Sequence, residues 1–227
     1  GVDGRLVKYR FFTYRLPVQN GCQLITYPDS LGGNLSALRT VVGRYLEDVI
    51  TGVHVLPFYP SSADRGFAPI TYERVEPSFG SWEDIEALAA HKDLIVDFMV
   101  NHLSRQSHYF TDFVEKKDAS RYRDFFIRYD RFWPDGRPTE EDLGRIYTRK
   151  PRPPYIEVDF ADGSRERVWC TFDYEQIDLD LSRPATRRFI GEQLRGLCAR
   201  GARVIRLDAV AYTTKRPGTK CFFLEPE

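Results

Sequence analysis

The sequence predicts an α/β fold in which helices cover a parallel sheet and an inserted subdomain interrupts the pattern. β-type and helical segments alternate through residues 23–100, which is the rhythm of βαβ units. That rhythm stops over residues 117–176 and resumes over residues 183–207. We therefore expect four βα units, with the insertion after the third strand.

The first βα unit is predicted over residues 23–46. Residues 23–27 form a short β-type run, and the Pro and Gly residues that follow it mark a loop. Asn34 is a favoured helix cap because its side chain can accept a hydrogen bond from the first turn. Apolar residues then recur at helical spacing: Leu35, Leu38, Val42, Tyr45 and Leu46.

The second and third strands are predicted over residues 53–56 and 94–100, with a helix between them. Ser81 is suited to cap that helix. Glu83 and Asp84 follow in its first turn, where the helix dipole favours acidic side chains. These segments complete a βαβαβ pattern.

The insertion is predicted to contain little helix, because prolines interrupt most of residues 117–176. An Asp-Gly pair at residues 162–163 lies between two β-type runs and predicts a hairpin. The division of the chain that follows has three parts: residues 1–116 as the first sheet-and-helix part, residues 117–176 as the inserted subdomain, and residues 177–227 as the continuation of the first part.

The fourth unit is predicted from a helix and a strand beyond the insertion. Pro184 in the first turn and an apolar stripe predict a helix over residues 183–200, and Gly201 ends it. Residues 204–207 form the fourth strand.

The composition excludes several classes of partner. The 33 basic residues balance the 33 acidic ones, which leaves no net charge to attract nucleic acid or an acidic membrane. No apolar run is long enough to span a bilayer, and no secretory signal is visible. The cysteines match no zinc or redox motif, so we expect reduced thiols in a cytoplasmic protein: Cys22, Cys170, Cys198 and Cys221.

Polar residues gather where the predicted strands end. Asn101 and His102 follow the third strand, and Arg206 and Asp208 end the fourth. Asp64 lies in the loop after the second strand. In a barrel of parallel strands the C-terminal ends share one mouth, so these residues would converge there.

Arg206 and Asp208 stand two apart on a strand and therefore face the same side. A guanidinium beside a carboxylate favours its ionised form, which is the form that attacks a sugar carbon. A structural ion pair is the alternative. His102 could equally be a hydrogen-bonded core histidine, Asp64 a turn former, and the basic run 149–152 a solvated face.

Five segments in a fixed order are more specific than any single residue: QLITY at 23–27, VHVLPF at 53–58, ADRGFAP at 63–69, DFMVNH at 97–102 and IRLDA at 205–209. Together with residues 125–129 and 168–172 of the insertion, they resemble the sucrose phosphorylases of the amylase superfamily (glycoside hydrolase family 13). The resemblance implies the N-terminal half of a (β/α)8 TIM barrel, strands 1–4, with a small α+β subdomain inserted after strand 3.

The resemblance implies a retaining double displacement. Asp208 matches the nucleophile that forms a β-glucosyl ester, and Arg206 matches the arginine that orients it. Four further residues match the −1 subsite, which holds the glucosyl ring: Asp64, Phe67, His102 and Gln176. Three residues fall where the insertion offers a loop to phosphate or fructose: Tyr147, Arg149 and Lys150.

The resemblance implies reversible phosphorolysis of sucrose, giving α-glucose 1-phosphate and fructose, with no metal or organic cofactor. Asn101 matches a calcium-liganding asparagine of related amylases, but the phosphorylase branch is not expected to use it. Sucrose 6-phosphate phosphorylase and glucosylglycerate phosphorylase are the enzyme alternatives. A truncated sugar-binding fragment is the non-enzyme alternative.

Only the first four strands of such a barrel are expected in this chain. The family's acid/base glutamate follows the fifth strand and its transition-state-stabilising aspartate follows the seventh. An open half barrel would expose two sheet edges, so we expect a missing half or an oligomer. Four side chains are expected to face the uncovered barrel interior: Leu24, Val55, Val96 and Ile205.

Overall fold

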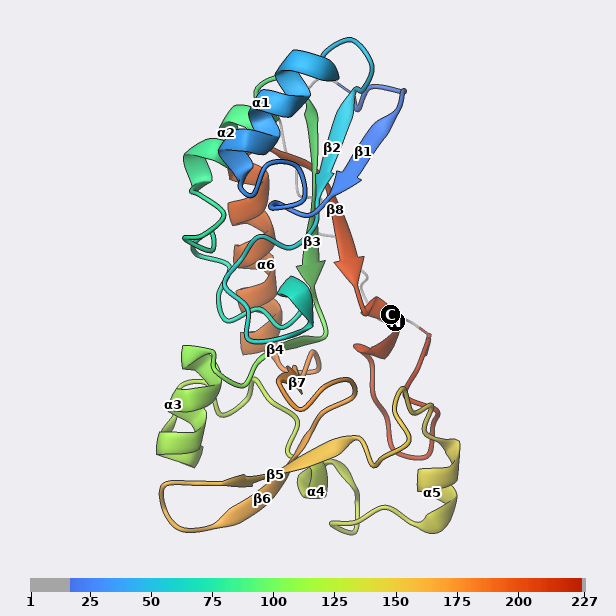
Figure 1. The fold of residues 1–227 in the computed structure, drawn as a ribbon. Helices are drawn as coiled ribbons and strands as arrows, with labels where there is room; N and C mark the ends of the chain where they lie inside the picture. Colours follow the sequence, from blue (N-terminus) through green and yellow to red (C-terminus); the bar gives the residue numbers. More distant parts are fainter. Residues whose placement is uncertain (1–16, 226–227) are drawn as a thin grey trace, which may run out of the picture.

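Four parallel strands form the central sheet of the computed structural model, which describes residues 17–225 (Figure 1). Their order across the sheet is β1 (Gln23–Thr26), β2 (Gly52–Val55), β3 (Asp93–Met99) and β8 (Ala202–Asp208). The predicted strands are confirmed, with ends shifted by one or two residues. The outer ends of the predicted parts 1–116 and 177–227 lie outside the described residues.

Three helices cover one face of this sheet: α1 (Leu35–Tyr45), α2 (Trp82–Ala89) and α6 (Pro184–Ala199) (Figure 1). Their starts follow the local sequence. The Asn34 side chain accepts a hydrogen bond from the Ala37 amide over 2.9 Å. Ser81 and Asp84 form a reciprocal capping box, and Pro184 occupies the first turn of α6. The predicted caps are therefore confirmed.

Four side chains predicted to face the barrel interior lie on the opposite face of the sheet, so this prediction is wrong. Leu24, Val55, Val96 and Ile205 pack against the hydrophobic core under the helices, and not into the barrel interior. Side chains along a strand alternate between the two faces of the sheet. Assigning one residue to the wrong face therefore assigns every second residue of that strand, and their neighbours on the adjacent strands, to the wrong face as well. The uncovered face carries Ile25, which is 64 % exposed, and a group of polar side chains.

The chain between β3 and α6, which contains the predicted insertion, includes two antiparallel strand pairs. β4 (His102–Ser104) pairs with β7 (Gln176–Asp178), so His102 opens a new strand instead of ending β3. β5 (Tyr155–Asp159) pairs with β6 (Arg165–Trp169), which confirms the predicted hairpin. Three helices lie between β4 and β5: α3 (His108–Lys116), which precedes the predicted insertion, α4 (Tyr129–Phe132) and α5 (Glu140–Arg145). Short 3-10 turns occur at Asp64–Gly66, Lys117–Ala119 and Val210–Tyr212.

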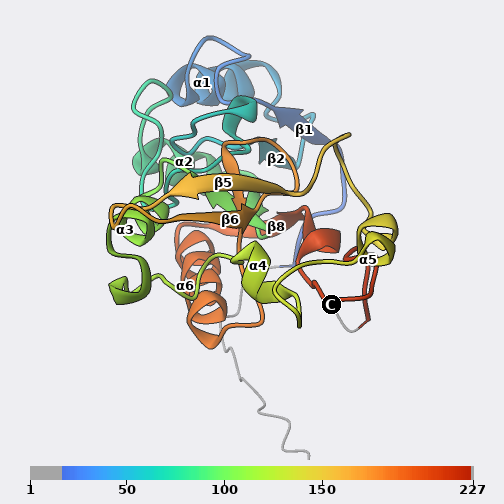
Figure 2. The ribbon, with the colours of Figure 1, turned by 90° about the horizontal axis from the view of Figure 1, so that it is seen from below.

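The insertion contacts both the helix that precedes it, α3, and the segment that follows β8. Phe113 of α3 contacts Phe126 and Phe160, with ring centroids 5.7 and 5.2 Å apart. Seen from below, β5 and β6 cross under the sheet and α5 lies beside the segment after β8 (Figure 2). The Tyr147 amide donates to the Lys220 carbonyl over 2.9 Å, which joins the insertion to the segment after β8.

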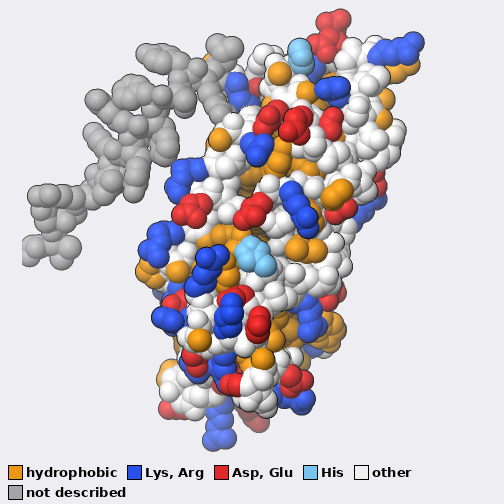
Figure 3. All heavy atoms as spheres, turned by 90° about the vertical axis from the view of Figure 1, so that its left-hand side faces the viewer, with side chains coloured by type: hydrophobic (Ala, Val, Ile, Leu, Met, Phe, Trp, Pro, Cys, Tyr) orange, Lys and Arg blue, Asp and Glu red, His pale blue; other side chains and the backbone are white. Residues whose placement is uncertain are grey.

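The face on the helix side mixes cationic and anionic side chains (Figure 3). This surface agrees with the balanced charge of the sequence. Within residues 17–225, none of the helices has the length and apolar character needed to cross a membrane.

Candidate active site

A cavity of about 480 Å³ lies where the C-terminal ends of the parallel strands meet the insertion. Its lining brings together residues from five separate parts of the chain. Seven of the residues singled out in the sequence line it: Asp64, Phe67, His102, Arg149, Lys150, Gln176 and Asp208. The predicted convergence of these residues is therefore observed, while their individual roles stay predictions.

Asp208 reaches this cavity from the last position of β8. Its Oδ1 lies 3.0 Å from Arg206 Nη2, and its side chain is 21 % exposed. Ala209 follows with a φ of 58°, which turns the chain sharply at the end of the strand. The hydrogen bond to Asp97, together with the charge of Asp208, raises the pKa of Arg206 and keeps this guanidinium charged. The structure thus presents an oriented, ion-paired carboxylate to the cavity.

His102 and Gln176 are the most buried of these lining residues and lie beside Asp64. His102 Nε2 lies 2.8 Å from the Phe67 carbonyl oxygen, so this nitrogen carries a proton and donates it. Gln176 Nε2 donates to the same carbonyl over 2.9 Å and to Asp64 Oδ2 over 3.3 Å. Burial lowers the pKa of His102 despite the carboxylates around it, so the ring is neutral near pH 7.

The loop that carries Asp64 and Phe67 depends on its glycine. Asp64, Arg65 and Gly66 all have positive φ, and Gly66 has a φ of 104°. A Cβ on Gly66 would lie 2.8 Å from the Pro57 carbonyl oxygen, so a side chain there would displace the loop. The tight turn lets the Phe67 carbonyl reach both His102 and Gln176.

The basic loop of the insertion meets the cavity through Arg149 and Lys150 but not through Tyr147. Tyr147 stacks on Phe222 instead, with ring centroids 4.3 Å apart. It lines a separate, much smaller cavity that it shares with Arg149. Tyr147 therefore does not line the 480 Å³ cavity, because its ring packs against the segment after β8. Its predicted role in a phosphate or fructose loop stays a prediction.

Phe172 and Asp173 also line the cavity, although the sequence reasoning assigned them no role. The Phe172 ring lies 5.3 Å from the His102 ring and 4.9 Å from the Tyr212 ring. The signal for Phe172 lay in the segment at residues 168–172. Its aromatic residues could not be sorted by sequence into core and cavity positions.

A buried ion pair underlies the site and was also missed. Lys215 Nζ lies 2.9 Å from Asp178 Oδ2, and both side chains are almost fully buried. Burial alone would raise the pKa of Asp178, but Lys215 and the hydrogen bonds from Thr171 outweigh it and hold the pKa below its usual range. The Asp178 carboxylate is therefore ionised, and its contact with Lys215 joins the segment after β8 to β7.

Asn101 takes part in the same cluster. Its Oδ1 accepts a hydrogen bond from Lys215 Nζ over 3.2 Å. An ammonium group beside the Asn101 oxygen and the Asp178 carboxylate does not fit a calcium site, which needs several free oxygen ligands. Within residues 17–225, no cluster of three or more His, Cys, Asp or Glu side chains is arranged to hold a metal ion.

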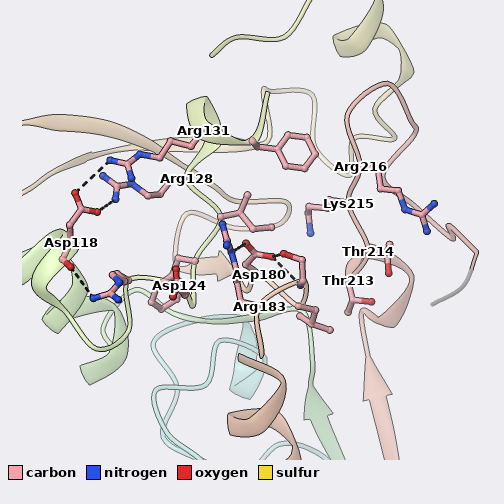
Figure 4. Close-up of a pocket in the computed structure, with 16 residues that line it drawn as sticks. Asp118, Asp124, Arg128, Arg131, Asp180, Arg183, Thr213, Thr214, Lys215 and Arg216 are labelled. Atoms are coloured by element: carbon pink, nitrogen blue, oxygen red, sulfur yellow. Dashed lines mark hydrogen bonds and ion pairs between the residues drawn. The ribbon is translucent and has the colours of Figure 1, made fainter. Parts of the chain in front are cut away.

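A second and larger cavity, of about 690 Å³, lies between the insertion, the start of α6 and residues 213–216 (Figure 4). Its charged side chains face one another. Arg183 pairs with Asp180 at 3.3 Å, and Arg131 lies 3.6 Å from Asp118. The 480 Å³ cavity is the better active-site candidate, because its lining contains the oriented Asp208 carboxylate.

Comparison with known proteins gives consistent results. The family model described as alpha amylase, catalytic domain, matches residues 28–220. The chain is 50 % identical over 212 residues to a sucrose phosphorylase of Streptococcus mutans, covering 93 % of this chain and 44 % of that protein. It is 47 % identical over 216 residues to a sucrose 6(F)-phosphate phosphorylase of Thermoanaerobacterium thermosaccharolyticum, again covering 93 % of this chain and 44 % of the relative.

Solved structures show the same similarity. The crystal structure of the sucrose 6F-phosphate phosphorylase from Thermoanaerobacter thermosaccharolyticum superimposes with a TM-score of 0.89 at 47 % identity, covering 93 % of this chain and 44 % of that one. A trehalose-6-phosphate hydrolase of Bacillus licheniformis matches with a TM-score of 0.72 at 22 % identity, covering 86 % and 36 %, and shares the fold. The chain thus spans less than half the length of these proteins.

Proposed function

Because the chain belongs to the alpha-amylase catalytic-domain family, we propose that it supplies the glucosyl half of a phosphorylase active site. Its parallel sheet is the N-terminal half of a (β/α)8 barrel and supplies strands 1–4. The reaction that we assign to the complete protein is reversible phosphorolysis of sucrose. Its products are α-glucose 1-phosphate and fructose.

The first chemical step forms a bond between an Asp208 carboxylate oxygen and C1 of the glucosyl unit. The bond from C1 to the fructosyl oxygen breaks, and its electron pair leaves with that oxygen. A general acid protonates the leaving oxygen, and we place this acid outside the 227 residues. Phosphate then attacks C1 and releases Asp208, so two inversions give net retention.

One observation carries this proposal: the ion-paired Asp208 carboxylate lines the same cavity as Arg149 and Lys150. A carboxylate that attacks a sugar carbon and cations that attract phosphate are two of the groups that the reaction requires. Asp64 and Gln176, linked to each other, are suited to hold hydroxyls of the glucosyl ring. The 50 % identity to a sucrose phosphorylase supports the choice of sucrose.

A sucrose 6-phosphate phosphorylase is the second candidate. It is supported by two adjacent cations that line the cavity, Arg149 and Lys150, because cationic side chains also attract the phosphate group of a sugar phosphate. A relative of that activity is 47 % identical. Glucosylglycerate phosphorylase is a further alternative, with relatives at 34 to 36 % identity.

The test is product formation by the full-length protein with phosphate and each donor in turn. We expect fructose and α-glucose 1-phosphate from sucrose, at a higher kcat/KM than from sucrose 6-phosphate or glucosylglycerate. A higher kcat/KM with another donor would identify that donor, and not sucrose, as the substrate. Sugar binding without any product would support the non-enzymatic sugar-binding alternative.

We further propose that the uncovered sheet face is covered by additional barrel strands or by association of chains. Ile25 on this face is 64 % exposed, and open strand edges favour pairing. A polypeptide of residues 1–227 alone should therefore associate and show no phosphorolysis. Light scattering and a fructose-release assay check this, and an active monomer would contradict it.

We also propose a cytoplasmic location, supported by the buried thiols of Cys170 and Cys221.

A further inference from the structure

A chain of polar contacts crosses the uncovered face of the sheet and ends on Asp208. His54 Nε2 lies 2.7 Å from Asp97 Oδ2. Arg206 Nη1 donates to Asp97 Oδ1, and Arg206 Nη2 lies 3.0 Å from Asp208 Oδ1. Three neighbouring strands, β2, β3 and β8, therefore contribute to the orientation of one carboxylate.

The parallel register explains why these side chains meet. His54 lies opposite Ile95 across β2 and β3, and Asp97 stands two residues further along β3 on the same face. Asp97 lies directly opposite Arg206 across β3 and β8. Asp208 is two residues beyond Arg206 and shares its face. The contacts thus follow from the rigid sheet and need no loop to form them.

In this series of contacts the buried Asp97 orients the more exposed Arg206. The Asp97 side chain has no exposed surface, whereas the Arg206 side chain is 49 % exposed. A half-exposed guanidinium keeps several rotamers open, so its direction depends on the buried carboxylate that it contacts. Two contacts on different oxygens fix the plane of the Asp97 carboxylate, while one contact would let it rotate. His54 provides the second contact.

The backbone beneath Asp97 is held as well. The Tyr59 hydroxyl donates to the Asp97 carbonyl over 3.2 Å. This contact fixes the main chain but does not select the orientation of the carboxylate. The His54 N–H is the contact that does so, because it meets Oδ2 and leaves Oδ1 for Arg206.

We propose that His54 is a positioning residue for Asp208 and acts through Asp97 and Arg206. This inference rests on the proposed function, in which Asp208 is the nucleophile. With Oδ1 of Asp208 held by Arg206, we assign Oδ2 as the oxygen that attacks the glucosyl carbon. A purely structural His54 would only satisfy the buried Asp97, and its loss would lower stability without changing turnover by the folded protein.

The test uses the full-length protein with α-glucosyl fluoride and phosphate. In the first step Asp208 forms the bond to C1, the C–F bond breaks, and fluoride leaves with the electron pair without needing a proton. His54→Leu removes the donor, while His54→Gln keeps an N–H group that can reach Asp97. Val53→Ala is the matched control, because Val53 is the preceding residue of β2 and faces the helices.

We expect His54→Leu to lower kcat for fluoride release by about 10²-fold with little change in KM, as for other losses of alignment. His54→Gln should recover most of that loss. Val53→Ala should lower the melting temperature and leave kcat unchanged. If His54→Leu does not fold, His54→Asn, whose amide is too short to reach Asp97, replaces it with the same expected loss.

The outcomes separate the inference from the proposed function. Fluoride release by the wild type supports the glucosyl-transfer function, and no release contradicts it. Normal kcat for His54→Leu or His54→Asn with an active wild type contradicts only the positioning role. A loss in His54→Gln as large as in His54→Leu contradicts the role of the N–H donor.

Discussion

Two networks of charged side chains in this protein each start from a buried carboxylate, but the cations that they contain differ in exposure and in their further contacts. Each contains a carboxylate without exposed surface that contacts a cation: Asp97 with Arg206, and Asp178 with Lys215. Lys215 is 2 % exposed and makes its remaining contacts with buried oxygens. Arg206 is 49 % exposed and passes its second contact to Asp208, which faces the cavity.

This difference separates a structural ion pair from a functional one. In the Lys215 network, which we call closed, the polar contacts of the cation are all with buried oxygens, so they stabilise the packing of the insertion against the strand ends. The Arg206 network remains open at Asp208, so its free energy contributes to orienting a carboxylate toward a ligand. Changes in the open network should therefore alter turnover, and changes in the closed network should alter stability.

The largest effect is expected for Asp208→Asn in the full-length protein. The amide has the same size but cannot act as the nucleophile, so kcat should fall by on the order of 10⁴-fold or more. The free energy of unfolding should change by less than about 1 kcal/mol, because Asp208 is partly exposed. Steady-state kinetics and urea unfolding measure both quantities. Turnover near the wild-type value would exclude Asp208 as the nucleophile.

The closed network is tested by Lys215→Met. Removing one partner leaves the Asp178 carboxylate buried without its cation, which should lower the free energy of unfolding by about 3–5 kcal/mol. Urea unfolding followed by tryptophan fluorescence measures the change. Adding Asp178→Leu should restore part of the stability, because an apolar pair avoids the unpaired charge. A loss below about 1 kcal/mol would show that the pair contributes little.

Asp64→Ala should have a smaller effect, confined to the glucosyl half of the reaction. Loss of hydrogen bonds to sugar hydroxyls should remove about 3 kcal/mol of transition-state stabilisation, or roughly 10²-fold in turnover. The factor should be similar for phosphate and for other acceptors. Arg149→Ala is the contrasting variant, and its defect should depend on the acceptor. A defect of Asp64→Ala that appears with one acceptor only would move Asp64 out of the −1 subsite.

The smallest effect is expected for Arg131→Ala in the 690 Å³ cavity. Arg131 and Asp118 are about 60 % exposed, and exposed ion pairs contribute less than about 1 kcal/mol. Both turnover and the free energy of unfolding should stay close to their wild-type values. A tenfold change in turnover would instead assign this larger cavity a part in the reaction.

Much of the fold could be predicted because its signals are local. The caps at Asn34 and Ser81 and the Pro184 start of α6 depend on neighbouring residues along the chain. The four β-type runs and the Asp-Gly hairpin likewise carry their own period and turn residues. The candidate site was predictable for a related reason: polar residues directly after parallel strands must gather at one end of the sheet.

The sequence by itself therefore determined the order of the four parallel strands and of the three helices that cover them, and most of the residues that line the cavity. The tertiary structure decided which face of the sheet the helices cover, and so placed Val55 in the core and His54 beside Asp97. It also decided that Tyr147 packs on Phe222. His54 and its partner Asp97 lie 43 residues apart in the chain, and strand alternation offers two equivalent faces until the helices bury one of them.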